Sequence, residues 1–243
     1  MTEQRAVPAG AAGDLRATDL NLAVLISGRG SNLQALLRHQ GAFRVSLVIS
    51  NRPDAEGLVY AREAGVETAV IDHRLFDERA DFEQALAETL SRNNLQLIVL
   101  AGFMRILGAA FVSRFVGRMI NLHPSLLPDF RGLKTHERAL EAGVKEHGAS
   151  VHFVTPELDG GPVIAQITLP VEPEDTPQTL ASRLLPLEHK LLVSVVRWFG
   201  EGRVRYANGQ VCFDGDTLAQ PLRVAAAGSA GSGLPGADPS GIG

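Results

Sequence analysis

Asn121, His123 and Asp159 are the residues whose types best suit acid–base chemistry. Asn121 and His123 lie two positions apart in a predicted strand, so their side chains point to the same face. An imidazole titrates near neutral pH, and a nearby carboxylate favours its protonated form. A cationic histidine and an amide N–H stabilise an oxyanion, while a carboxylate helps to carry a proton away from an amine. If the fold brings them together, these side chains predict attack by an amine on a carbonyl carbon.

Each of these residues also has a simpler structural interpretation. Asn121 and His123 could anchor the loop that follows their strand, and Asp159 could cap the turn at Gly160 and Gly161. His123 could also bind a metal ion, but no second ligand lies at a convincing spacing from it. We therefore predict a site without a metal.

A glycine-rich segment, SGRGSN at residues 27–32, joins an apolar run to a predicted helix. Glycine lets the backbone approach an anion closely, and the free N–H groups of a helix start favour phosphate. Gly30, Ser31 and Asn32 are the candidate phosphate ligands. The third glycine of the dinucleotide fingerprint is absent, and no acidic residue ends the next strand. The segment therefore predicts a monophosphate site, or else a structural turn with Ser31 as the helix cap.

Apolar runs alternate with helical patterns over the first half of the chain. The predicted strands cover residues 20–27, 45–50, 66–71, 95–100 and 119–123, and the predicted helices cover residues 32–38, 54–64, 76–91 and a short stretch around 111–115. Asp54 is the expected cap of the second helix. Such alternation predicts an α/β fold with a mostly parallel, twisted sheet flanked by helices. Ligands then bind at the carboxyl ends of the strands.

The pattern changes after Pro128. We predict a helix over residues 135–142, antiparallel edge strands at 149–154 and 163–170, a helix over 177–199, and a closing hairpin of 204–206 with 210–213. Pro186 lies inside the long helix and predicts a kink or a break there. We expect residues 1–19 to be a disordered extension, residues 20–213 to be the folded domain, and residues 214–243 to be a flexible tail rich in Gly, Ala and Pro.

Composition narrows the classes of function. Hydrophobic residues make up 45% of the 243 residues and the formal net charge is −4, so neither nucleic acid nor an anionic membrane is an expected partner. No apolar run is long enough to span a bilayer, and residues 1–19 lack the apolar core of a signal peptide. Cys212 is the single cysteine and cannot form an intramolecular disulfide, which fits a cytoplasmic protein.

Four segments together resemble the phosphoribosylglycinamide formyltransferase family. They are SGRGSN (27–32), LAGFMRIL (100–107), NLHPSLLP (121–128) and the stretch from His152 to Pro162 that contains ELDGGP. The resemblance extends in order over residues 20–213. It implies a Rossmann-like formyltransferase fold and an enzyme of purine biosynthesis. Such an enzyme moves the formyl group of 10-formyltetrahydrofolate, used as a co-substrate, to the amine of 5-phosphoribosylglycinamide without a metal.

The resemblance also assigns roles to individual residues. Asn121, His123 and Asp159 match the catalytic residues of the family. The ribonucleotide contacts match Gly30, Ser31, Asn32 and Glu188, and the folate contacts match Arg79, Met104, Arg105, Ile106, Leu107 and Asn121. The implied partners are therefore small molecules. The chain is expected to be a monomer or a homodimer.

Some positions depart from the common pattern of the family. Arg29 stands where many relatives have asparagine, Arg131 and Lys134 differ in the loop after the catalytic strand, and Pro186 lies close to Glu188. Three alternative functions remain: a formyltetrahydrofolate hydrolase, a methionyl-tRNA formyltransferase, or a nucleotide-phosphate sensor without catalysis. The first two normally carry an additional domain. The third predicts loss of the catalytic residues, which are all present here.

Overall fold

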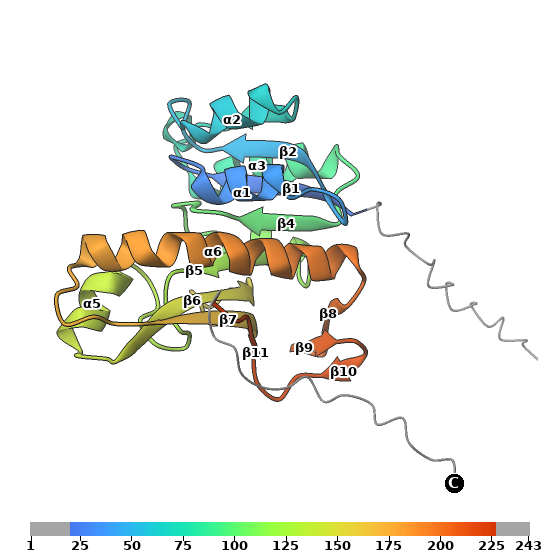
Figure 1. Ribbon diagram of the computed structural model, residues 1–243. Coiled ribbons are helices and arrows are strands. Elements are labelled where there is room, and N and C mark those ends of the chain that lie inside the picture. Colours follow the sequence, from blue (N-terminus) through green and yellow to red (C-terminus); the bar gives the residue numbers. More distant parts are fainter. Residues whose placement is uncertain (1–19, 227–243) are drawn as a thin grey trace, which may run out of the picture.

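A computed structural model describes residues 20–226 of the protein, and its centre is an eight-stranded sheet (Figure 1). Its strands are β1 (Asn21–Ile26), β2 (Arg44–Ser50), β3 (Glu67–Val70), β4 (Leu97–Leu100), β5 (Met119–His123), β6 (Glu146–Phe153), β7 (Val163–Pro170) and β11 (Leu222–Arg223). They are ordered β11-β7-β6-β5-β4-β1-β2-β3. A small antiparallel sheet contains β8 (Val204–Ala207), β9 (Gln210–Phe213) and β10 (Asp216–Thr217).

The strand directions confirm the predicted α/β class. The first five strands pair in parallel, while β6 runs antiparallel to both β5 and β7. The chain builds outward from β1 to β3 and then returns to place β4 on the other side of β1. The neighbouring carboxyl ends of β1 and β4 therefore form the switch point at which open α/β sheets bind ligands.

Helices cover both faces of the sheet, and the strand residues alternate between two cores. On one face lie α1 (Ser31–Arg38), α2 (Gly57–Glu63) and α6 (Pro177–Gly200), and on the other lie α3 (Arg79–Ser91) and α4 (Ala109–Arg114). In β1, Leu22 and Val24 pack on the first core, whereas Ala23 and Leu25 pack on the second. The remaining helical elements are the 3-10 turn η1 (His73–Leu75) and α5 (Thr135–Glu141).

The predicted start of the second helix is wrong, and so is a break of the long helix at Pro186. The second helix begins at Gly57 and not at residue 54, because the Asp54 carboxylate pairs with Arg52 at 2.7 Å and caps no helix. Helix α6 continues through Pro186 without a break. Pro186 is exposed, and the buried face of the same helix keeps the segments on either side of it packed on the sheet.

Ordered structure extends past residue 213, the predicted end of the folded domain. Strands β10 and β11 follow, and Leu222 of β11 pairs in parallel with Ala165 of β7. A strand of two residues shows no periodicity in sequence, so only its pairing partner reveals it. The predictions for residues 1–19 and 227–243 lie outside the described residues. Within residues 20–226, no helix combines the length and the apolar composition needed to cross a membrane.

Candidate active site

The glycine-rich segment forms a tight loop between β1 and α1. Gly30 is the residue that caps α1, with a left-handed φ of 73°, and no side chain caps this helix. The loop packs on the start of α2, where the Gly57 N–H donates to the Gly28 carbonyl at 3.1 Å. The alternative of a turn capped by Ser31 is therefore wrong. The first N–H groups of α1 have no intrahelical partner and remain available to an anion.

The Gly30→Ala substitution is expected to raise the KM for a phosphorylated substrate by at least about tenfold. A Cβ at Gly30 would lie 2.6 Å from the Gly57 Cα atom, so the loop must shift, and the positive φ adds strain. Steady-state kinetics on a phosphorylated acceptor would measure the effect. An unchanged KM would contradict the assignment of this loop to phosphate binding.

The fold brings the three predicted catalytic side chains together. Asn121 and His123 lie on β5, and Asp159 reaches them from the turn between β6 and β7. The Asn121 Nδ2 atom is 3.4 Å from Asp159 Oδ1, and His123 Nδ1 is 3.4 Å from Asp159 Oδ2. The side chains of His123 and Asp159 are only 7% and 8% exposed. This cluster adjoins the switch point, because Asn121 pairs with Leu100 at the end of β4.

Backbone geometry holds Asp159 in place. Asp159 has a φ of 48°, and its Oδ2 atom accepts a hydrogen bond of 2.9 Å from the Gly132 N–H. Burial raises the pKa of the Asp159 carboxyl, but hydrogen bonds from His152 and Gly132 and the nearby imidazoles outweigh burial and hold this pKa below its ordinary value. Asp159 is therefore a carboxylate at neutral pH.

His123 behaves differently from our expectation. Burial lowers the pKa of the imidazole below its ordinary value, and the Phe130 carbonyl and Asp159 oppose this effect only in part. The prediction that Asp159 keeps the ring charged is thus wrong for the ligand-free protein. Each ring nitrogen nevertheless faces an acceptor, since Nε2 lies 3.0 Å from the Phe130 oxygen and Nδ1 faces Asp159. If the ring took up a second proton, both of its N–H groups would therefore have a hydrogen-bond acceptor.

His152 is a member of the cluster to which the sequence alone assigned no role. Its Nε2 atom lies 3.2 Å from Asn121 Nδ2 and 3.5 Å from Asp159 Oδ1. His152 is opposite Asn121 in the register of β6 with β5. Only strand pairing could reveal this contact, because the two residues are far apart in sequence. His152 orients the amide of Asn121 and the carboxylate of Asp159.

Most of the predicted folate residues follow β4, the strand that pairs with β5. Residues 103–108, which we call the folate segment, connect β4 to α4 without regular secondary structure. The Met104 and Ile106 side chains are 66% and 64% exposed, whereas Leu107 is buried. Exposed apolar side chains beside polar groups are typical of a ligand site. The Arg79 guanidinium lies near the end of this segment. A Cβ atom added to Gly108 would be 3.3 Å from Arg79 Nη2.

The glycine-rich loop contacts helix α6 at Glu188. The Asn32 Nδ2 atom donates to Glu188 Oε2 at 3.3 Å, so Pro186 does not displace this carboxylate from the loop. Burial raises the pKa of the Glu188 carboxyl, and Asn32 and the charge of Arg29 lower it in part. The Asn32 Oδ1 atom is buried and has no hydrogen-bond partner within residues 20–226. These groups can therefore accept hydrogen bonds from a bound ligand.

Comparison with known proteins decides the family. The sequence profile of the formyl transferase family matches residues 20–196. Phosphoribosylglycinamide formyltransferase of Escherichia coli is 45% identical over 205 residues, which are 82% of this chain and 96% of the relative. The chain belongs to the phosphoribosylglycinamide formyltransferase family.

Solved structures of this family agree with the fold. The enzyme from Coxiella burnetii superposes with a TM-score of 0.81 at 51% identity, covering 84% of this chain and 98% of that one. Glycinamide ribonucleotide transformylase 1 from Symbiobacterium toebii gives a TM-score of 0.77 at 42% identity, covering 80% of this chain and 93% of that one. The predicted formyltransferase fold is confirmed.

The departures from the common family pattern lie outside the cluster of Asn121, His123 and Asp159. Arg131 forms an ion pair with Glu157, and Lys134 forms one of 2.9 Å with Glu137. Arg29 lies within the glycine-rich loop and is exposed. Within residues 20–226, no group of three or more His, Cys, Asp or Glu side chains is arranged to hold a metal ion.

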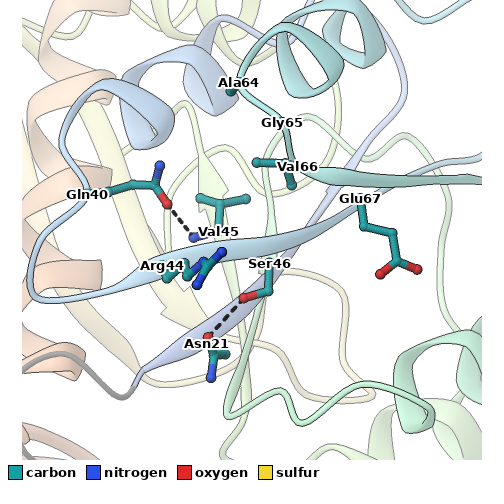
Figure 2. A pocket seen from close by; sticks show the side chains of 9 residues that line it. All are labelled: Asn21, Gln40, Arg44, Val45, Ser46, Ala64, Gly65, Val66 and Glu67. Carbon is teal, nitrogen blue, oxygen red and sulfur yellow. Dashed lines mark hydrogen bonds between the residues drawn. The ribbon is translucent and has the colours of Figure 1, made fainter.

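A pocket of about 230 Å³ lies at the amino ends of β1, β2 and β3 (Figure 2). It is lined by Asn21 at the start of β1, by Ser46 and its neighbours at the start of β2, by Gln40 from the loop before β2, and by residues 64–67 that lead into β3. Gln40 Oε1 accepts from the Val45 N–H at 2.8 Å, and the Ser46 hydroxyl donates to Asn21 Oδ1 at 2.9 Å. These polar groups already satisfy one another at the amino ends of the strands. We therefore assign this pocket no part in the family's chemistry.

Two further histidines pack behind the loop that carries Phe130. His136 Nδ1 lies 3.1 Å from His147 Nε2, and the His147 ring contacts the Phe130 ring edge-on. Burial, with a smaller contribution from the charge of His136, lowers the pKa of His147 from 6.5 to about 4. His147 is therefore neutral in the folded protein at neutral pH.

Stability is expected to fall as the pH decreases from 6.5 to about 4, the window between the ordinary and the folded pKa of His147. In that window the unfolded chain binds a proton that the folded chain rejects, so protonation favours unfolding by on the order of 3 kcal/mol. The His147→Gln variant should lose less stability over the same window. Denaturant titrations at both ends of the window measure this difference. Equal losses in the two proteins would contradict the assignment.

Proposed function

We propose that the protein transfers the formyl group of 10-formyltetrahydrofolate to the amine of 5-phosphoribosylglycinamide, in purine biosynthesis. The observation that carries this proposal is the position of Asn121, His123 and Asp159. They lie at the carboxyl end of β5; next in the sheet come β4, which leads into the exposed apolar segment, and then β1, which leads into the glycine-rich loop. The acceptor and the donor can thus meet at one catalytic cluster.

The phosphate loop and Glu188 suit the ribonucleotide. The N–H groups at the start of α1 bind the phosphate at Gly30, Ser31 and Asn32. The Glu188 carboxylate and the buried Asn32 Oδ1 atom accept hydrogen bonds from ribose hydroxyls. This assignment accounts for a buried amide oxygen that otherwise has no hydrogen-bond partner among residues 20–226.

The folate segment suits the donor. Met104 and Ile106 provide apolar surface for a flat ring system, and the backbone of Arg105 and Leu107 supplies polar groups. The Arg79 guanidinium, whose side chain is 59% exposed, is free to bind a carboxylate of the donor. Asn121 faces this segment from the end of the neighbouring strand and contributes to the same site.

Formyl transfer uses the side chains of Asn121, His123 and Asp159. The amine nitrogen forms a bond to the formyl carbon, and the Asn121 amide stabilises the negative charge that develops on the formyl oxygen, together with the positive charge that the His123 imidazole gains when it takes up a proton. The pair of Asp159 and His123 accepts the proton that the amine loses, and the ring nitrogens of His123 already face two acceptors. The bond from the formyl carbon to the folate nitrogen then breaks, and that nitrogen takes the proton.

An assay with defined substrates tests the proposal. Purified protein is mixed with glycinamide ribonucleotide and a 10-formylfolate donor, and absorbance follows the deformylated folate. We expect product only when the ribonucleotide is present. Deformylation without it would instead indicate a hydrolase, and no reaction would favour a nucleotide-phosphate sensor. We also propose a cytoplasmic location and, as the acting form, a monomer or a homodimer that needs neither a metal nor nucleic acid.

A further inference from the structure

The folate segment lacks the internal hydrogen bonds of a helix or a strand, yet it exposes two large apolar side chains. A loop of this kind loses conformational entropy when it is held in one shape for a ligand. Two of its backbone N–H groups are bound by side chains from other elements. These groups belong to Met104 near its start and to Gly108 at its end.

Ser27 holds the first end. The Ser27 Oγ atom accepts a hydrogen bond of 2.7 Å from the Met104 N–H and donates one of 2.5 Å to Asn51 Oδ1. Ser27 and Asn51 are both buried, and Asn51 is bound in turn to His73. The hydrogen atom of the Ser27 hydroxyl is therefore donated to Asn51, and the hydroxyl oxygen accepts the Met104 N–H of the segment.

Glu83 holds the second end. Glu83 is a buried acid on α3, and its Oε1 atom accepts a hydrogen bond of 2.7 Å from the Gly108 N–H. The same oxygen is 3.4 Å from Arg79 Nε, one helical turn earlier. A buried carboxylate is unfavourable without such partners. Glu83 thus joins the end of the segment, the start of α4 and Arg79 in one cluster.

We propose that Ser27 and Glu83 are positioning residues that hold the folate segment in its ligand-binding shape from its two ends. Neither of them needs to touch the donor, and Glu83 also orients Arg79 towards the end of the segment. The donor side of the site is then shaped before the donor binds. This inference rests on the proposed function, because it assigns the segment to folate.

Binding of tetrahydrofolate, measured by calorimetry, tests the proposal. Ser27→Ala and Glu83→Ala are each expected to weaken this binding about three- to tenfold, the effect of one lost hydrogen bond. Glu83→Gln keeps an oxygen for the Gly108 N–H and should restore much of the affinity. For Glu83→Ala, the affinity for glycinamide ribonucleotide should stay within about twofold of the wild-type value.

Asp175 offers a matched control. Its side chain is 3% exposed, it accepts the Glu172 N–H at 2.8 Å, and it pairs with Arg183, so it has the same kinds of partner as Glu83. It lies just before α6, and its hydrogen-bond and ion-pair partners within residues 20–226 are Glu172, Thr179 and Arg183, none of which belongs to the folate segment. Asp175→Ala should lower thermal stability as Glu83→Ala does, but should leave tetrahydrofolate binding unchanged.

Hydrogen exchange gives a readout that needs no ligand. Peptides covering residues 103–108 should exchange faster in Ser27→Ala and Glu83→Ala than in the wild type, because the Met104 and Gly108 N–H groups lose their acceptors. Unchanged exchange together with unchanged binding would overturn the proposal, and so would equal losses of affinity for both substrates in Glu83→Ala. Wild-type protein that binds no tetrahydrofolate would instead overturn the proposed function and this inference with it.

Discussion

Replacing Asp159 with asparagine is expected to lower kcat about a thousandfold, within the range that general acid–base groups contribute. Asparagine keeps an oxygen for the Gly132 N–H and fills nearly the same space, so the turn should survive. It loses the negative charge that faces His123 Nδ1, and with it the ability to draw a proton from the amine. The affinities for both substrates should therefore change little.

Steady-state kinetics and calorimetry on the Asp159→Asn variant separate turnover from binding. Glu157→Gln is a suitable control, because Glu157 lies on the same turn, is 67% exposed and pairs with Arg131 at the surface. Its kcat should remain near the wild-type value. A kcat of Asp159→Asn within about tenfold of wild type would remove Asp159 from the proposed mechanism.

The His123→Gln substitution is expected to lower kcat by about two to three orders of magnitude. Glutamine can still donate a hydrogen bond, but it cannot accept the proton that the attacking amine releases. The side chain of His123 is 7% exposed, so a neutral amide of similar size should be tolerated in its site. Most of the loss should therefore appear in kcat and little in the KM of either substrate.

Comparison with His39→Gln controls for the loss of a histidine elsewhere. His39 is exposed at the end of α1, where Nδ1 lies 2.8 Å from the Ala35 carbonyl oxygen, and its replacement should leave kcat unchanged. Circular dichroism confirms that each variant is folded. If His123→Gln kept wild-type turnover, proton uptake would have to be assigned to Asp159 or to His152.

The local pattern of apolar and polar residues was enough to predict much of the fold. Apolar runs predicted the five parallel strands, since a strand buried on both faces needs apolar residues throughout. The antiparallel additions β6 and β7 were predicted as well. Helix boundaries were less certain, because capping depends on one side chain that can choose another partner, as Asp54 does with Arg52. Pro186 does not break α6, because tertiary packing holds the helix together.

The candidate site was likewise predictable from the sequence only in part. Its residue types and their order were visible in sequence, since Asn121 and His123 share a strand and the glycines mark a phosphate loop. The pKa of His123 was not predictable from its neighbour Asp159 alone, because the degree of burial decides whether the neutral form wins. His152 was likewise invisible as a site residue until β6 paired with β5.

By itself, the sequence determined the chemistry available to this protein: an amide, an imidazole and a carboxylate, a phosphate-binding loop and an apolar segment. These follow from residue types and from short spacings along the chain. The tertiary structure decided which of them meet, because strand order and register set distances between residues that are far apart in sequence. It also decided that Ser27 and Glu83 hold the folate segment, because hydrogen bonds between separate elements exist only after those elements have packed.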